Sequence, residues 1–178
     1  PCGAVMAGRV PPVAAFALVA LFPAGLLIWG AASGGWPLWL GFLWMAAVSP
    51  AADTIIAHGF GDAGAGAHFP AADAVSVLLA LAHFALLGCA LWAFAGDWLS
   101  VPQRIALFLG AGMYFGQVSN SNAHELIHRH SRALFRLGAA VYVSLLFGHH
   151  ISAHRLVHHV HVATDADPNS ARLGESFW

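Results

Sequence analysis

A chain of 178 residues that is 59% hydrophobic and 8% charged, with a mean hydropathy of +0.71, has too few polar residues to cover a globular protein in water, so we expect it in a lipid bilayer. Its formal net charge is −1 and it has no run of like charges, which argues against the basic surface that a nucleic-acid partner requires. The only cysteines are Cys2 and Cys89, too few for a disulfide framework or a thiolate metal cage.

Three apolar stretches in the first half of the chain predict transmembrane helices. They comprise residues 13–32, 36–57 and 74–95. Each has about 20 residues, the length that crosses a hydrocarbon core of roughly 30 Å. Ser33-Gly34-Gly35 leaves room only for a tight turn, so the first two stretches should form a hairpin, with a kink at Pro50 in its second leg. A Gly-rich loop over 58–70 separates the second stretch from the third.

A fourth apolar run, residues 105–118, continues through polar residues to His124. We predict one helix over 101–130, which at 1.5 Å per residue is about 45 Å long and projects its C-terminal third beyond the hydrocarbon. With the N-terminus inside, four crossings place His124 at the cytoplasmic face. The arginines that follow it agree with this orientation: Arg129, Arg132 and Arg136.

A fifth apolar run, 134–147, has only about 14 residues, the length of a re-entrant or interfacial helix rather than a span. Arg136 lies within it, which also argues against a crossing. The predicted fold is therefore an all-α integral membrane domain over residues 1–178. It has about four transmembrane helices and a short re-entrant or interfacial helix, with the histidine-rich segments at the cytoplasmic end.

Two histidine boxes carry the chemistry. The first is His124-Glu125-Leu126-Ile127-His128, and the second is His154-Arg155-Leu156-Val157-His158-His159. Histidines four positions apart lie on one face of a helix, so each pair can reach a single metal region. His159 is turned about 100° from His158, which lets the two bind different metals. The boxes can share a site only if the fifth run returns the chain to the same side of the membrane.

Histidine is costly next to lipid, so packing alone does not explain two spaced pairs and an adjacent fifth ring. We therefore predict a metal site whose ligands are His124, His128, His154, His158 and His159. An all-imidazole set suits iron, zinc or copper better than magnesium or calcium. For other histidines we expect helix-end or hydrogen-bonded core positions: His58, His68 and His83. Five residues are left without a role: Asp53, His130, His149, His150 and His161.

The first box also fits H-E-x-x-H, the pattern in which two histidines bind zinc and the glutamate is the general base of a metalloprotease. A membrane zinc protease is thus an alternative of a different class. It needs one further ligand and a water, which leaves most of the second box unexplained. A bis-histidine haem protein is the third class.

The motif Asn122-Ala123-His124-Glu125-Leu126-Ile127-His128 resembles the integral-membrane alkane 1-monooxygenase family. The more telling resemblance runs from His158-His159-Val160-His161-Val162-Ala163-Thr164-Asp165-Ala166-Asp167-Pro168 to Gly174-Glu175-Ser176-Phe177. Membrane fatty-acid desaturases and hydroxylases share the general histidine-box pattern and are the nearest alternative function.

The resemblance implies a non-haem di-iron monooxygenase, a multi-pass protein of the bacterial inner (cytoplasmic) membrane with its boxes facing the cytoplasm. Two iron ions would be held by histidines of these boxes and of later ones. The implied reaction uses O2 to hydroxylate the terminal methyl of an n-alkane or similar alkyl chain to a primary alcohol. The chain has no flavin, nicotinamide or iron–sulfur motif, so electrons must come from outside it. The resemblance implies rubredoxin with its reductase as their source. Oligomeric state and substrate chain length stay open.

In two respects the sequence departs from that pattern. It ends before the further histidines, so we expect a fragment truncated at its C-terminus that is inactive by itself. Ala153 precedes His154 where an acidic residue is expected. Three carboxylates are candidates for accepting the free ring N–H of ligand histidines: Glu125, Asp165 and Asp167. The plainer interpretation is a solvated helix residue for Glu125 and a turn ending at Pro168 for the aspartates.

Overall fold

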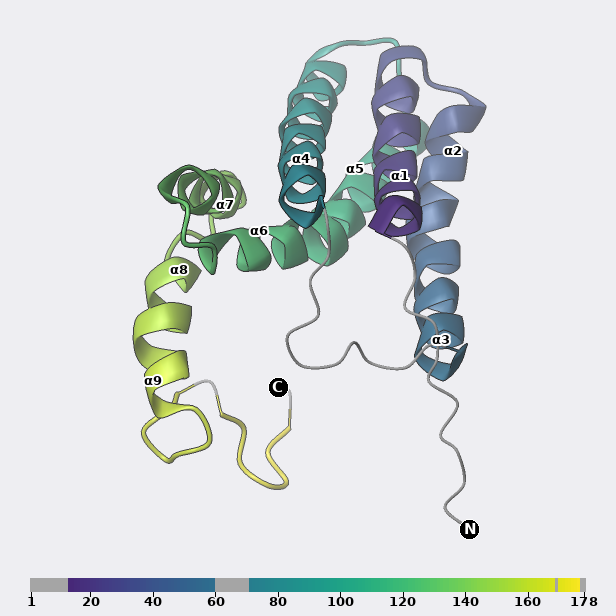
Figure 1. Ribbon diagram of the computed structural model, residues 1–178. Helices are drawn as coiled ribbons and strands as arrows, with labels where there is room; N and C mark the ends of the chain where they lie inside the picture. Colours follow the sequence, from purple (N-terminus) through teal and green to yellow (C-terminus); the bar gives the residue numbers. More distant parts are fainter. Residues whose placement is uncertain (1–12, 60–70, 169, 177–178) are drawn as a thin grey trace.

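The computed structural model describes residues 13–59, 71–168 and 170–176, and these residues form helices and connecting turns without a strand (Figure 1). The predicted all-α fold is confirmed. Most of the predicted loop over 58–70, with His68 in it, lies outside the described residues, as does the side chain of His58.

The predicted N-terminal hairpin is confirmed. Helix α1 (Val13–Ser33) turns at Gly34 and Gly35, whose φ angles of 66° and 70° lie in the left-handed region that glycine adopts at low cost, and α2 (Trp36–Leu43) follows. The two helices approach closely, because a Cβ added at Gly30 would lie 2.5 Å from the Cα of Leu38.

The second leg of the hairpin is α2, then η1, a π-helical segment (Trp44–Val48), and then α3 (Ser49–Gly59). The π-helical residues end two positions before Pro50, which has no N–H for the helical ladder. The interruption thus falls where a kink was predicted. Asp53, on α3, is exposed.

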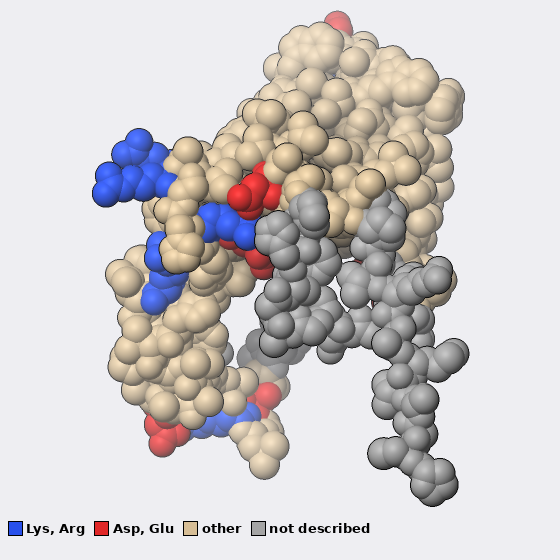
Figure 2. All heavy atoms as spheres, in the orientation of Figure 1, with Lys and Arg blue, Asp and Glu red and all other residues tan. Residues whose placement is uncertain are grey.

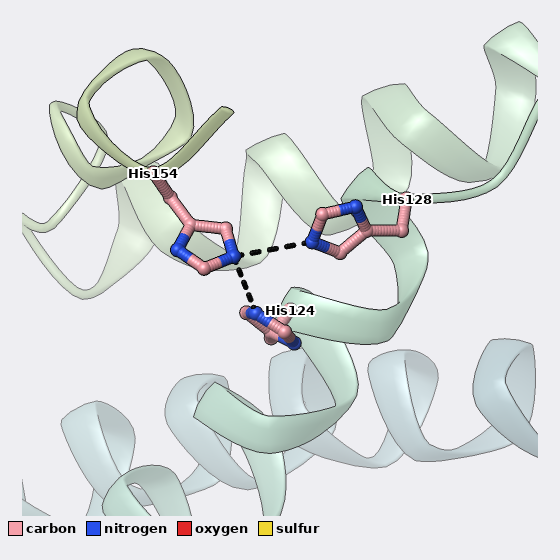
Figure 3. A group of neighbouring side chains, drawn as sticks. All are labelled: His124, His128 and His154. Atoms are coloured by element: carbon pink, nitrogen blue, oxygen red, sulfur yellow. Dashed lines mark hydrogen bonds between the residues drawn. The ribbon is translucent and has the colours of Figure 1, made fainter. Parts of the chain in front are cut away.

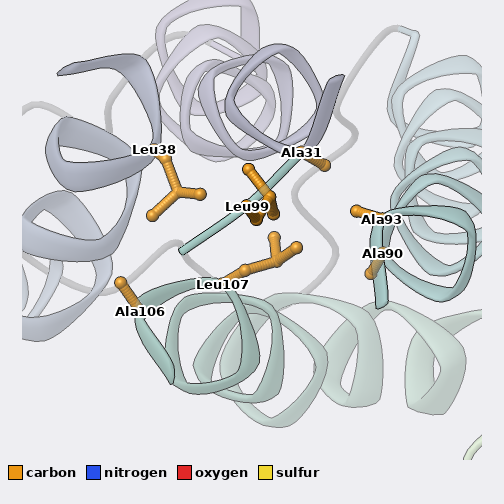
Figure 4. Close-up of a cluster of buried hydrophobic side chains, with 7 residues drawn as sticks. All are labelled: Ala31, Leu38, Ala90, Ala93, Leu99, Ala106 and Leu107. Atoms are coloured by element: carbon orange, nitrogen blue, oxygen red, sulfur yellow. The ribbon is translucent and has the colours of Figure 1, made fainter. Parts of the chain in front are cut away.

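Helix α4 (Ala72–Ala95) packs along α1 and completes a set of three helices long and apolar enough to cross a membrane. The windows that meet this criterion are Phe16–Ser33, Trp36–Ile55 and Ala72–Ala95, which confirms the three predicted spans. Leucines pack against small alanines where these helices meet the next one, as Figure 4 shows for Ala31, Leu38, Ala90, Ala93, Leu99, Ala106 and Leu107. In a bilayer, where water does not drive association, small side chains such as these alanines permit close helix packing. The face of this bundle seen in Figure 2 is nearly free of charge.

The fourth helical run begins after a capping box formed by Ser100 and Gln103. It comprises α5 (Val101–Tyr114), the π-helical η2 (Phe115–Ser119) and α6 (Asn120–Ile127). The run is therefore continuous over 101–127 and ends three residues before the predicted boundary. Figure 1 shows α5 rising behind α1, whereas α6 runs crosswise beneath α4. The C-terminal part of this run, which carries the first box, therefore leaves the bundle of apolar helices.

Helix α7 (Arg132–Ser144) packs against α6 and, with only 13 residues, is short for a span. It lies crosswise to α4 in Figure 1, and whether it is re-entrant or interfacial stays a prediction. Gly138 permits the contact, since a Cβ there would lie 2.6 Å from the Cβ of Leu126. The chain then turns back beneath α6 as α8 (His150–Ser152), the π-helical η3 (Ala153–His158) and α9 (His159–His161).

Candidate metal centre

The two histidine boxes meet, as their shared site requires. Nε2 of His154, on η3, lies 2.7 Å from Nε2 of His124 and 3.2 Å from Nε2 of His128 (Figure 3). His124 and His128 precede α7 in the sequence, whereas His154 follows it. Nε2 of His159 lies 2.9 Å from Nε2 of His154 as well. Potential ligand atoms of His124, His128 and His154 all lie within 4.8 Å of one another.

This arrangement suits a bound cation. A neutral imidazole has one N–H and one bare nitrogen, so Nε2 of His154 can donate one hydrogen bond or accept with a single lone pair. It cannot satisfy three neighbouring nitrogens at once. Nitrogens bonded to one metal at about 2.0–2.1 Å are themselves roughly 3 Å apart, close to the separations found here. The residues present therefore fit a metal ion held by imidazoles.

The electrostatics of His154 favour its neutral, metal-binding form. Loss of hydration, and then the neighbouring histidines His124, His159, His150 and His128, lower the pKa of its imidazole to about 4. The pKa of His128 is lowered as well, first by loss of hydration and then by His124. Imidazoles bind metals only when unprotonated, so these shifts keep the nitrogens available at neutral pH.

The π-helical backbone of η3 explains why His159, rather than His158, accompanies His154. The N–H of His159 donates to the carbonyl of His154, the i→i−5 bond of a π-helix. This winding brings residues five apart to the same side, whereas the α-helical spacing used for the prediction pairs residues four apart. His124 and His128 keep that spacing at the end of α6, and their rings lie 4.8 Å apart between centroids.

His158 has a different partner. Its Nδ1 donates to Oδ2 of Asp167 over 2.8 Å, and the hydroxyl of Ser170 donates to the same oxygen. The Asp167 side chain has 0% exposure. A carboxylate that accepts the Nδ1 proton fixes the tautomer and leaves Nε2 bare for a metal. Asp167 thus lies where the sequence hypothesis placed a supporting carboxylate.

The other two carboxylate candidates are not hydrogen-bonded to the described histidines, although Glu125 is close enough to His128 to oppose the lowering of its pKa. Glu125 and Asp165 are both exposed, and neither makes a hydrogen bond to a box histidine among the described residues. For Glu125 this is the plainer of the two interpretations. A zinc-protease geometry, in which that glutamate acts on a metal-bound water, gains no support from its position.

The remaining described histidines are either buried in the helix bundle, exposed, or packed against the site. His83 is completely buried on α4, and its Nε2 donates to Oγ of Ser144, whose own hydroxyl donates to the carbonyl of Val141. The expectation of a hydrogen-bonded core group is confirmed. His130, His149 and His161 are exposed. His150, which had no predicted role, lies against the site, with its ring stacked on that of His154. Its signal in the sequence was the four-residue spacing from His154.

The relatives found by comparison with known proteins share one name, alkane 1-monooxygenase. The chain is 34% identical over 108 residues to "Alkane 1-monooxygenase 1" of Pseudomonas aeruginosa, a match that covers 57% of this chain and 28% of that protein. It is 28% identical over 153 residues to "Alkane 1-monooxygenase 1" of Alcanivorax borkumensis, covering 81% of this chain and 37% of that protein. For "Alkane 1-monooxygenase" of Pseudomonas putida the identity is 32% over 97 residues, covering 54% and 24%.

The matched part of the chain thus spans between 24% and 37% of the length of these three relatives. No family model matches the chain, and no solved structure matches it.

Proposed function

We propose that this chain is the N-terminal membrane domain of a non-haem di-iron monooxygenase that hydroxylates the terminal methyl of n-alkanes, or of similar alkyl chains, to primary alcohols. The observation that carries the proposal is the convergence of four Nε2 atoms, from His124, His128, His154 and His159, beside a bundle of apolar helices. The similarity to relatives named alkane 1-monooxygenase supports the choice of reaction.

The donor set suggests how two irons would be divided. His124, His128, His154 and His159 would hold one ion at their meeting point. His158 stands apart, with its Nδ1 proton taken by Asp167, and would offer its Nε2 to the second. Bound iron supplies the activation of O2. Further ligands for the second ion would come from a longer protein.

The reaction balances as one alkane methyl, one O2, two electrons and two protons giving one primary alcohol and one water. No described group supplies the electrons, which we assign to rubredoxin and its reductase. An alkane offers no polar group for recognition, so its binding rests on apolar burial at about 0.8 kcal/mol per CH2. The bilayer would deliver such a substrate to helices with apolar surfaces.

We place the site at the cytoplasmic face of the bacterial inner membrane. Arg129, Arg132 and Arg136 follow directly after the first box, as the positive-inside rule expects. In the view of Figure 2 the basic side chains lie near the box-bearing helices and the C-terminal segment, away from the apolar bundle.

The decisive test uses the complete protein that contains this chain. We expect close to two irons per polypeptide and NADH-driven, rubredoxin-dependent conversion of octane to 1-octanol in membranes. One tightly bound zinc, with peptide hydrolysis lost in Glu125→Ala, would instead establish the protease. A Soret band would establish a haem protein.

We further propose that the 178-residue chain by itself inserts in the membrane but does not turn over alkane. The five box histidines can satisfy one iron and part of a second, which leaves coordination positions open. Co-expression with the rest of a complete relative should restore activity, because membrane helices that insert independently can associate afterwards. Robust turnover by the chain alone would contradict this account of the site.

A further inference from the structure

Four aromatic rings form a continuous stack beside the metal centre. Phe147, His150, His154 and His158, here called the ring column, have successive centroid separations of 4.9, 5.0 and 5.4 Å. The angles between successive ring planes are only 20°, 22° and 24°. These separations fall in the range in which aromatic side chains stack favourably.

His150 occupies an inner place in the ring column. Phe147 covers one side of its ring and His154 the other, while the ring of Tyr142 meets it at 5.2 Å and 61°. Tyr142 is 1% exposed on α7, so it provides a rigid support for His150. Among the described residues, no hydrogen bond holds the ring nitrogens of His150. Ring contacts therefore fix its position.

The orientation of His154 matters more than that of any other ligand candidate, because its Nε2 is the atom that the other three approach. The lone pair of an imidazole nitrogen lies in the plane of the ring, so a bound metal must lie close to that plane. His150 and His158 stack on His154 with nearly parallel planes. Without these neighbours the ring could rotate about its side-chain bonds and carry the lone pair away from the meeting point.

We infer that His150 is a positioning residue of the proposed metal centre, which holds the ring plane of His154 by stacking and does not itself bind the metal. Its place in the column separates it from the ligand candidates: the group of converging nitrogens comprises His124, His128 and His154, and His159 contacts it through His154. This inference rests on the proposed function, because it assumes that His154 is a ligand.

Two substitutions at His150 distinguish the contribution of its ring from that of its ring nitrogens. His150→Phe keeps a ring of similar shape in the column and removes both nitrogens, whereas His150→Ala removes the ring. His130→Ala, at an exposed histidine outside the column, is the control. The probe is Co2+ alone, added to the detergent-purified chain, with the dissociation constant obtained by competition with a chromophoric chelator. The visible absorption of bound Co2+ reports the ligand geometry.

We expect His150→Ala to weaken Co2+ binding by about 10- to 100-fold, the usual effect of removing a group that orients a metal ligand, and to change the Co2+ spectrum at saturation. His150→Phe and His130→Ala should bind like the wild type with the same spectrum. Circular dichroism and hydrogen exchange over α6 and α7 show whether a variant has kept its fold.

Different results overturn different claims. Wild-type affinity and spectrum in His150→Ala would overturn the positioning role while leaving the metal centre in place. Equal losses in His150→Phe and His150→Ala would also overturn it, because the nitrogens and not the ring would then matter. If the wild type itself bound no Co2+, both the metal centre and the inference would fail.

Discussion

Nε2 of His124 lies 2.7 Å from Nε2 of His154, although 30 positions separate the two residues in the chain. Helix α7 makes this approach possible, because it packs on α6 and leads the chain back to the second box next to α6. The distance between the boxes therefore depends on how closely α6 and α7 pack.

Gly138→Ala should disturb this packing. The added Cβ would lie 2.6 Å from the Cβ of Leu126 and 2.9 Å from the carbonyl oxygen of Ala123, so α7 has to shift. We expect a loss of about 1–3 kcal/mol in stability, as for other overpacked sites, despite the better helix propensity of alanine. Co2+ affinity should fall as His154 moves from His124. Thermal unfolding in detergent and metal titration measure the two effects.

Gly112→Ala on α5 is the matched control, because nothing lies within 4 Å of a Cβ at that position. It should gain up to about 1 kcal/mol from helix propensity and leave metal binding unchanged. Equal behaviour of the Gly138 and Gly112 variants would show that the α6–α7 contact does not control the site.

Each box histidine should be needed for hydroxylation in the complete protein. The variants are His124→Ala, His128→Ala, His154→Ala, His158→Ala and His159→Ala. All should insert in the membrane normally, because insertion depends on the apolar helices, and none should oxidise octane. His154→Ala should also cause the largest loss of Co2+ affinity, since its Nε2 contacts three other nitrogens. Substitution of His68 should do little. Near-normal octane hydroxylation by His154→Ala would refute the di-iron site.

The parts of the fold that follow local rules were predictable. Gly34 and Gly35 predicted the turn of the hairpin, and stretches of about 20 apolar residues predicted the spans. The meeting of the two boxes was also predictable, because a run as short as 134–147 does not cross a bilayer. What the sequence did not reveal is the π-helical winding of η3, which brings Nε2 of His159 to Nε2 of His154 while the ring of His158 stacks on that of His154.

The supporting groups show the same limit. Asp165 and Asp167 look equivalent in the sequence, two positions apart in one turn. Only the folded chain shows that Asp167 is buried against His158 while Asp165 is exposed. The four-residue spacing from His154 draws attention to His150. Its proposed role, however, depends on the rings of Tyr142 on α7 and Phe147 in the following turn, which contact its own ring only in the folded chain.

Acid should loosen the metal-free second box. The pKa of His154 is about 4 in the folded chain against 6.5 ordinarily, chiefly because its ring is desolvated. Between these values the unfolded segment binds a proton that the folded one does not, so stability falls as pH drops from about 6.5 to about 4. Hydrogen exchange over 149–161, corrected for the intrinsic effect of pH, should show protection lost in this window. His154→Asn should weaken the dependence, and constant protection from pH 7 to 5 would contradict it.

The carboxylate of Asp167 should matter to the metal centre far more than that of Asp165. Asp167→Asn keeps the size of the side chain but removes the charge that holds the Nδ1 proton of His158, so the ring loses its fixed tautomer and some of its basicity. We expect metal affinity in the complete protein to fall by about 10- to 100-fold, measured by iron retention against a chelator. Asp165→Asn makes the same chemical change at an exposed position of the same turn and should retain iron like the wild type. If both variants retained iron equally well, the bond between Asp167 and His158 would only stabilise the turn, and His158 would have no supported role as a ligand.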